Sequence, residues 1–196
     1  MSTPLIRPQN IPIIFPHLEA GREHVDIRWV ITPDIGHGAP DWWTTQWFPM
    51  RDWVLVYPVE VGPRPSPMRG EYLQNAVLDW LEKDEEGWFW GLADDTIPSE
   101  GFFASVARNA VDGVSAIVHP MADGGGKILC HGGENTMHPG TVDGAQVIWN
   151  LKAIKGERFT EEHCLDGLFI ERIYRRDKGL GWSFTGTIPV TYNALR

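Results

Sequence analysis

Two adjacent carboxylates follow an apolar run near the middle of the chain. Asp94 and Asp95 follow WFWGL, residues 88–92, with Ala93 between them and that run, which is typical of a buried strand. In open α/β sheets the ligand lies beyond the carboxyl ends of the strands, so both acids would face a binding site. Carboxylate oxygens are the donors that Mg²⁺ and Mn²⁺ prefer. The pattern therefore predicts a cation site, with capping of a helix that starts at Pro98 as the alternative.

Other acids stand where they could act on a ligand. Asp34 follows the apolar run at residues 26–32, and an acid at a strand end can accept hydrogen bonds from a base or a ribose. A turn-forming Asp is the alternative there. Asp166 lies in a helical pattern between apolar neighbours, where a carboxylate is unfavourable unless it faces a polar cleft and acts as a general base, or faces solvent. Asp143 and Gln146, in GTVDGAQVIWN, are further polar candidates.

Composition and charge narrow the class of protein. The chain has 196 residues, of which 42% are hydrophobic and 22% are charged, as in ordinary globular proteins. We therefore expect one domain that spans residues 1–196. A net charge of −9 argues against a binder of nucleic acid or of an anionic membrane, because such a protein should have a basic face. A small anionic ligand is compatible, since an arginine, a helix N-terminus or a metal ion can hold a phosphate.

Cysteine usage and the length of the apolar runs bear on the compartment. Cys130 and Cys164 form no Cys-x-x-Cys pair, so we expect two reduced thiols rather than a zinc site or a disulfide framework. Every apolar run is shorter than the roughly 20 residues of a membrane span. Residues 1–10 lack the pattern of a signal peptide. These features predict a cytoplasmic protein without a membrane span.

The hydrophobic pattern predicts strands that alternate with helices. Apolar runs typical of strands occur at 26–32, 53–57, 88–92 and 114–118, and helical spacing occurs at 71–82 and at 160–176. The alternation over at least the first 120 residues favours an α/β sandwich with a mostly parallel central sheet. The segment at 41–49 has no clear period. Its residues Trp42, Trp43 and Trp47 could pack in the core or form a platform for sugar rings.

Taken in chain order, these segments resemble the GT-A-fold glycosyltransferases, which use nucleotide-sugar donors. The resemblance covers most of the chain and rests on the order of TPLIRPQNIPII, DIRWVITPD, RGEYLQNAVLDWL, GWFWGLADDTIPSEGFF, VDGAQ and CLDGLFIERI. The fourth segment resembles the pattern around the Asp-x-Asp motif of the family. It departs from that motif at Ala93, where the family usually has the first Asp, and this difference leaves a metal-independent or inactive protein open.

The resemblance implies a fold, a reaction and a set of site residues. It implies a single-domain GT-A-like sandwich that moves a sugar from a nucleotide-diphosphate donor to a hydroxyl acceptor, in a metal-assisted and inverting reaction. Asp95 would hold Mn²⁺ or Mg²⁺, and Asp166 would be the base that deprotonates the acceptor. The nucleotide and the sugar diphosphate would be held by Arg7, Asp34, Arg69, Gly70, Asn75 and Asp94. The implied partners are the nucleotide-sugar donor and a carbohydrate or other hydroxyl acceptor.

Two other classes of protein stay open at this point. A non-catalytic protein that binds carbohydrate or nucleotide on a degenerate transferase fold would agree with Ala93 and with the short chain. A nucleotidyltransferase also places acids around a metal ion and a nucleotide. That class should have a glycine-rich loop followed by Arg and Lys after the first strand, whereas this chain has LIRPQN at residues 5–10.

Overall fold

The computed structural model describes residues 1–5, 7–33, 51–57, 59, 69–81, 86–154, 156–160, 165–186, 190–192 and 194–195. The side chains of Arg69, Glu71 and Leu165 are not among the features described. The predictions for Asp34, Cys164, Trp42, Trp43 and Trp47 therefore lie outside the described residues, as does the prediction for the Arg69 side chain.

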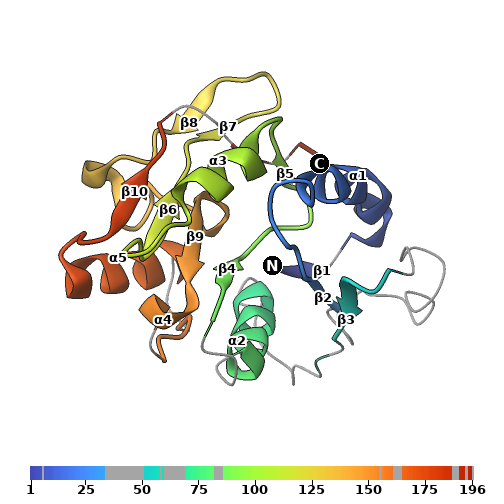
Figure 1. The fold of residues 1–196 in the computed structure, drawn as a ribbon, viewed down its shortest axis with the longest axis horizontal. Coiled ribbons are helices and arrows are strands. Elements are labelled where there is room, and N and C mark those ends of the chain that lie inside the picture. Colours follow the sequence, from blue (N-terminus) through green and yellow to red (C-terminus); the bar gives the residue numbers. More distant parts are fainter. Residues whose placement is uncertain are drawn as a thin grey trace.

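The central sheet consists of two parts that meet at the N-terminal strand. One part has the order β1 (Ser2–Leu5), β2 (Trp29–Pro33), β3 (Val54–Val56). The other has the order β10 (Trp182–Phe184), β6 (Ala116–Val118), β9 (Val147–Asn150), β4 (Trp88–Trp90). A parallel bridge between Ser2 and Gly91 joins them, and the N–H of Leu92 donates to the Ser2 carbonyl at 2.9 Å. The strand β1 thus lies between β2 and the chain that leaves β4 (Figure 1).

The central sheet is mixed, which corrects the expectation of a mostly parallel one. The pairs β1–β2, β2–β3 and β6–β10 are parallel, but β9 runs antiparallel to both β4 and β6. A parallel return requires a long crossover, usually a helix. After β6 the chain instead forms a hairpin of β7 (Met121–Ala122) and β8 (Ile128–Cys130), and it re-enters the sheet in the opposite direction.

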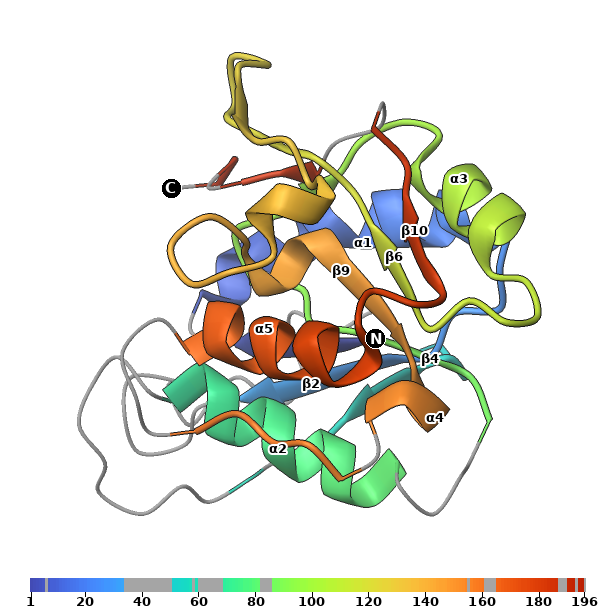
Figure 2. The same cartoon turned by 90° about the vertical axis from the view of Figure 1, so that its left-hand side faces the viewer.

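Strands β2, β4 and β9 are almost entirely apolar because both faces of the sheet are covered there. Along β2, Trp29 and Ile31 belong to one buried cluster and Val30 belongs to the other. Helices α1 (Ile11–Gly21) and α3 (Phe102–Asn109) pack in the first cluster, and α2 (Arg69–Leu81) and α5 (Leu165–Asp177) pack in the second. Figure 2 shows α1 above the strand β2 and α2 below it. Runs such as WVIT and VIW therefore have no polar face.

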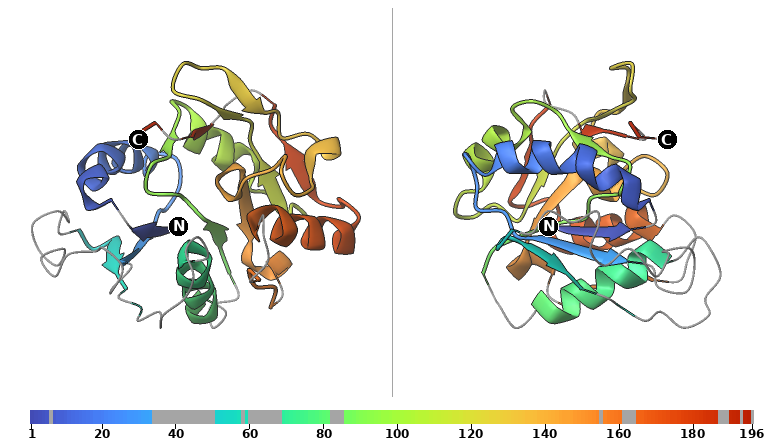
Figure 3. Two further views of the ribbon diagram at one scale, coloured as in Figure 1. Left: turned by 180° about the vertical axis from the view of Figure 1, so that it is seen from behind. Right: turned by 90° about the vertical axis from the view of Figure 1, so that its right-hand side faces the viewer.

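The segment after Asp95 differs from the sequence prediction. Ile97–Pro98 is not the start of a helix but the strand β5, which pairs antiparallel with β11 (Val190–Thr191). The helix α3 begins after Gly101, whose φ of 77° lies in the left-handed region that favours glycine. The strands β5, β11, β7 and β8 form a second, smaller sheet. In Figure 3 the β7–β8 hairpin projects from the body of the molecule near the C-terminal strand.

Candidate active site

A pocket of about 270 Å³ lies where β1 and β4 end. Arg7 follows β1, and Asp94 and Asp95 follow β4, so the topology brings residues separated by 87 positions together. Gly70, from the first turn of α2, and Asp166, from the first turn of α5, complete the lining on the other side. Six of the candidate residues named from the sequence thus line one pocket, at the edge of the sheet where open α/β folds bind ligands: Arg7, Gly70, Asp94, Asp95, Asp143 and Asp166.

The guanidinium of Arg7 bridges the two strand-end acids. Nη1 lies 2.5 Å from Oδ1 of Asp94 and 3.1 Å from Oδ2 of Asp95, and the backbone N–H of Arg7 donates to Oδ2 of Asp94 at 2.6 Å. Asp94 and Asp95 are only 4% and 2% exposed, so their charges need this partner. The amide of Asn10 also donates to the Asp94 carbonyl at 2.9 Å. The acids are therefore fixed in the pocket and do not cap α3.

A short turn at residues 143–146 forms another wall of the pocket. The 3-10 helix η4 (Gly144–Gln146) begins after Asp143, whose Oδ1 accepts the N–H of Ala145 at 2.9 Å. The N–H of Asp143 donates to Oε1 of Gln146 at 2.9 Å, so the turn is closed from both ends. The N–H of Gly144 is directed outward and donates to Oδ2 of Asp166 at 3.1 Å. Asp143 and Asp166 therefore face the same pocket from one turn and one helix.

The acidic surroundings perturb Asp143. Burial is the largest cause, followed by the negative charge of Asp166, and together with a smaller effect of Asp95 they raise the pKa of Asp143 to about 6. The hydrogen bond from Ala145 opposes this shift. Asp143 thus changes its charge close to neutral pH, which is the range in which proton transfer at an active site is useful.

The charges of the lining are unbalanced. Among the described residues of the lining, one guanidinium, that of Arg7, faces the carboxylates of Asp94, Asp95, Asp143 and Asp166. An anionic ligand would be repelled by this excess unless a cation accompanied it. Within the described ranges no three His, Cys, Asp or Glu side chains are grouped closely enough to form a metal cage of their own. Mg²⁺ usually takes one or two carboxylates together with phosphates of the substrate, and the oxygen donors of this pocket fit that pattern.

Asn75 is not brought to the pocket, in contrast to the sequence prediction. Its amide donates to the Phe159 carbonyl and accepts the Phe159 N–H, each at 2.9 Å, so it ties α2 to the segment before α5. The preceding residue, Gln74, lines the pocket in its place. The reason is helical geometry, because successive residues of a helix point about 100° apart. Gln74 and Tyr192 also line the pocket, although no motif or spacing in the sequence pointed to them.

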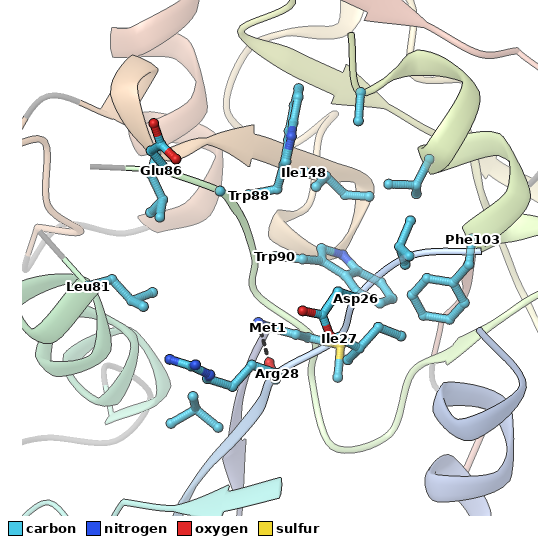
Figure 4. Close-up of a pocket in the computed structure, with 16 residues that line it drawn as sticks. Met1, Asp26, Ile27, Arg28, Leu81, Glu86, Trp88, Trp90, Phe103 and Ile148 are labelled. Carbon is cyan, nitrogen blue, oxygen red and sulfur yellow. Dashed lines mark hydrogen bonds between the residues drawn. The ribbon is translucent and has the colours of Figure 1, made fainter. Parts of the chain in front are cut away.

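A second hollow, of about 780 Å³, lies at the opposite ends of β2 and β4. Its walls are mostly apolar, with Trp90, Phe103 and Ile148 among them. Figure 4 shows the charged groups of Arg28 and Glu86 in this lining, on different elements. The acids around Arg7 do not contribute to it, so the two hollows are separate sites with different linings.

Comparisons with known proteins show which fold the chain shares. No family model and no curated protein matches the chain. Among solved structures, residues 1–349 of TarS from S. aureus, a glycosyltransferase, match 88% of this chain with a TM-score of 0.56 and 12% sequence identity. This chain spans 54% of the length of that structure. The chain therefore has a glycosyltransferase-like fold. No helix in the described part of the chain is both long and apolar enough to cross a membrane.

Proposed function

We propose that this chain is a glycosyltransferase of the GT-A type, which moves a sugar from a nucleotide-diphosphate donor to a hydroxyl acceptor with inversion. The observation that carries the proposal is the convergence of Arg7, Asp94, Asp95 and Asp166 on one pocket at the strand ends. The glycosyltransferase-like fold supports it independently of the side chains. The diphosphate of the donor needs positive charge, and Arg7 supplies one such charge in this pocket. The hydroxyl of the acceptor needs a base, and Asp166 is a carboxylate in the same lining.

The chemistry assigned to Asp166 is that of a general base. Its Oδ2 is held by the Gly144 N–H, and its other oxygen has no hydrogen-bond partner among the described residues. In the proposed step this free oxygen takes the proton of the acceptor hydroxyl while the acceptor oxygen attacks the anomeric carbon. The bond between that carbon and the diphosphate breaks, and its electron pair leaves on the diphosphate oxygen. Attack opposite to the leaving group inverts the anomeric configuration.

The cation remains part of the proposal, as Mn²⁺ or Mg²⁺ bound together with the donor. Asp95 is the residue that would hold it, and when bound it would supply the positive charge that stabilises the departing diphosphate. The nearby Arg7 provides one further positive charge on the same side. Ala93 offers no carboxylate at the first position of the motif, so we expect a weaker cation site than a complete Asp-x-Asp motif would give.

Release of nucleoside diphosphate tests the reaction without knowledge of the acceptor, because water can replace it slowly. Purified protein is incubated with UDP-, GDP- and dTDP-sugars and Mn²⁺, and the nucleoside diphosphate is quantified over time. We expect release from one nucleotide class and a loss of about 10²-fold or more in Asp166→Asn. Asp177→Asn, at the other end of α5, serves as the matched control. Equal release by wild type and Asp166→Asn would remove Asp166 from the mechanism.

The alternative of a non-catalytic binding protein rests on Ala93. It predicts that a nucleoside diphosphate or a carbohydrate binds but that no donor is consumed at any enzyme concentration. The release assay therefore separates the two readings, since only the transferase reading predicts turnover. Transfer of a nucleotidyl group would instead consume a nucleoside triphosphate and release inorganic pyrophosphate, which is quantified in a parallel incubation with triphosphates in place of the nucleotide sugars.

A further inference from the structure

The acids of the pocket differ in how their charge is balanced. Asp94 and Asp95 both contact Arg7. Asp143 and Asp166 have no Lys or Arg partner among the described residues, and each has one carboxylate oxygen bound only by a backbone N–H. Two neighbouring carboxylates that no cation neutralises lower the stability of the folded state. Groups that cost stability in this way are often retained because they serve a function.

The same turn holds both carboxylates. The N–H of Ala145 fixes Oδ1 of Asp143, and the N–H of Gly144 fixes Oδ2 of Asp166. The turn is anchored by Gln146, whose Nε2 donates to the buried His119 carbonyl at 3.0 Å. The two carboxylates are therefore held by consecutive peptide groups, and neither can turn away without breaking a hydrogen bond to the turn.

We propose that Asp143 and Asp166 take up the acceptor proton as a carboxylate pair, in which Asp166 receives the proton and Asp143 is a positioning residue that contributes its negative charge. This inference rests on the proposed function. The acceptor O–H bond breaks, the proton moves to the free oxygen of Asp166, and the electron pair of the O–H bond forms the new bond to the anomeric carbon. Protonation relieves the repulsion between the two acids, so the charge of Asp143 favours proton uptake.

The electrostatic surroundings agree with this role. Asp143 faces Asp166 on α5, Asp95 after β4 and Cys130 on β8, and Arg7 is the cation among the described residues that line the pocket. The raised pKa of Asp143 reflects its burial first and the charge of Asp166 second. Because the charge of Asp166 is one cause of this shift, its removal should lower the pKa of Asp143.

The kinetic test separates the charge of Asp143 from its role in the turn. Asp143→Asn keeps an oxygen for the Ala145 N–H but removes the charge, whereas Asp143→Ala removes both. We expect Asp143→Asn to lower kcat about tenfold, to change the pH profile between pH 5 and 7, and to leave the Kd of the nucleoside diphosphate within about twofold. It should also raise the thermal midpoint at neutral pH. An Asp143→Asn enzyme with wild-type kcat and pH profile would show that Asp143 only closes the turn, and would overturn the proposal.

A titration that needs no activity distinguishes this failure from failure of the proposed function. Carboxyl resonances of ¹³C-aspartate-labelled protein are followed from pH 3 to pH 8 in wild type and in Asp166→Asn. We expect the resonance of Asp143 to titrate at lower pH in Asp166→Asn, because the neighbouring charge is gone. An unchanged titration would overturn the pair. A shifted titration in a protein that consumes no donor would confirm the coupling but overturn the proposed function and the proton uptake that rests on it.

Discussion

The backbone N–H of Gly144 donates a 3.1 Å hydrogen bond to Oδ2 of Asp166, which lies 22 residues further along the chain. This contact joins the turn η4 to the first turn of α5, and the second oxygen of Asp166 has no hydrogen-bond partner among the described residues. The orientation of the proposed base therefore depends on how closely α5 approaches the turn, and this approach can be changed without touching the carboxylate.

Gly167 sets the approach of α5 to the preceding loop. A Cβ at this position would lie 2.6 Å from Cα of Pro139, so Gly167→Ala must move the helix or the loop. We expect about tenfold slower release of nucleoside diphosphate and a loss of about 1–3 kcal/mol in the free energy of unfolding. Kinetics and urea denaturation measure both. Gly133→Ala is the control, because its Cβ would meet open space. Wild-type rates in Gly167→Ala would mean that the position of α5 does not govern Asp166.

Removal of Arg7 should destabilise the fold. Arg7→Ala leaves the buried carboxylates of Asp94 and Asp95 without the guanidinium between them. We expect a loss of about 2–3 kcal/mol in the free energy of unfolding at pH 7, measured by urea denaturation. Arg175→Ala removes an exposed pair with Glu171 and should change stability by less than about 0.5 kcal/mol. Similar effects of the two substitutions would contradict the bridging role of Arg7.

The stability of the protein should depend on the charge of Asp143. The pKa of this carboxyl is about 6 in the folded protein against 3.8 normally, so the folded state binds its proton more tightly than the unfolded state. The favourable contribution of the protonated form is complete below about pH 4 and is lost as the pH rises through 6. We expect the free energy of unfolding of Asp143→Asn to be about 1–2 kcal/mol higher than that of the wild type above pH 7. The two values should be equal near pH 4. Urea denaturation at a series of pH values measures this difference in stability. A wild type that is more stable than Asp143→Asn above pH 7 would contradict the prediction and would be expected if a cation neutralised Asp143.

Asn75 should prove structural. Asn75→Asp keeps an acceptor for the Phe159 N–H but places a carboxylate oxygen against the Phe159 carbonyl, where the amide had donated. We expect a loss of about 1–3 kcal/mol in stability, with the affinity for nucleoside diphosphate unchanged. Calorimetry and thermal denaturation on the same preparation provide the comparison. A lower affinity for nucleoside diphosphate with an unchanged free energy of unfolding would instead indicate that Asn75 contributes to donor binding.

The sequence predicts the acids at the strand end because their position follows from local pattern alone. An apolar strand followed by Asp94 and Asp95 implies a site wherever the strand lies in the sheet. The contact with Arg7 could not be predicted, since it depends on β1 lying beside the end of β4 through a single bridge. Asp143 was recognisable as a polar residue in a turn, but its coupling to Asp166 exists only once α5 packs against that turn.

The fold shows the same division between local and long-range information. Strands and helices follow from apolar runs and helical spacing, with ends that move by a few residues. The direction of β9 could not be predicted, because the hydrophobic pattern of a short strand is the same for a parallel and an antiparallel neighbour. The β7–β8 hairpin before it sets the antiparallel direction. The segment Ile97–Pro98 became a strand because β11, near the other end of the chain, pairs with it. Such pairings across long separations are absent from any local pattern.

Calorimetry with UDP, GDP and dTDP, each with and without Mn²⁺, tests the central claim most directly. The account predicts saturable binding of one nucleoside diphosphate that requires Mn²⁺, because the acidic pocket otherwise repels the diphosphate, and loss of that binding in Asp95→Asn. Equal binding with and without Mn²⁺ would contradict the role of Asp95. If folded wild-type protein bound none of the three nucleotides under either condition, the assignment as a glycosyltransferase would be wrong.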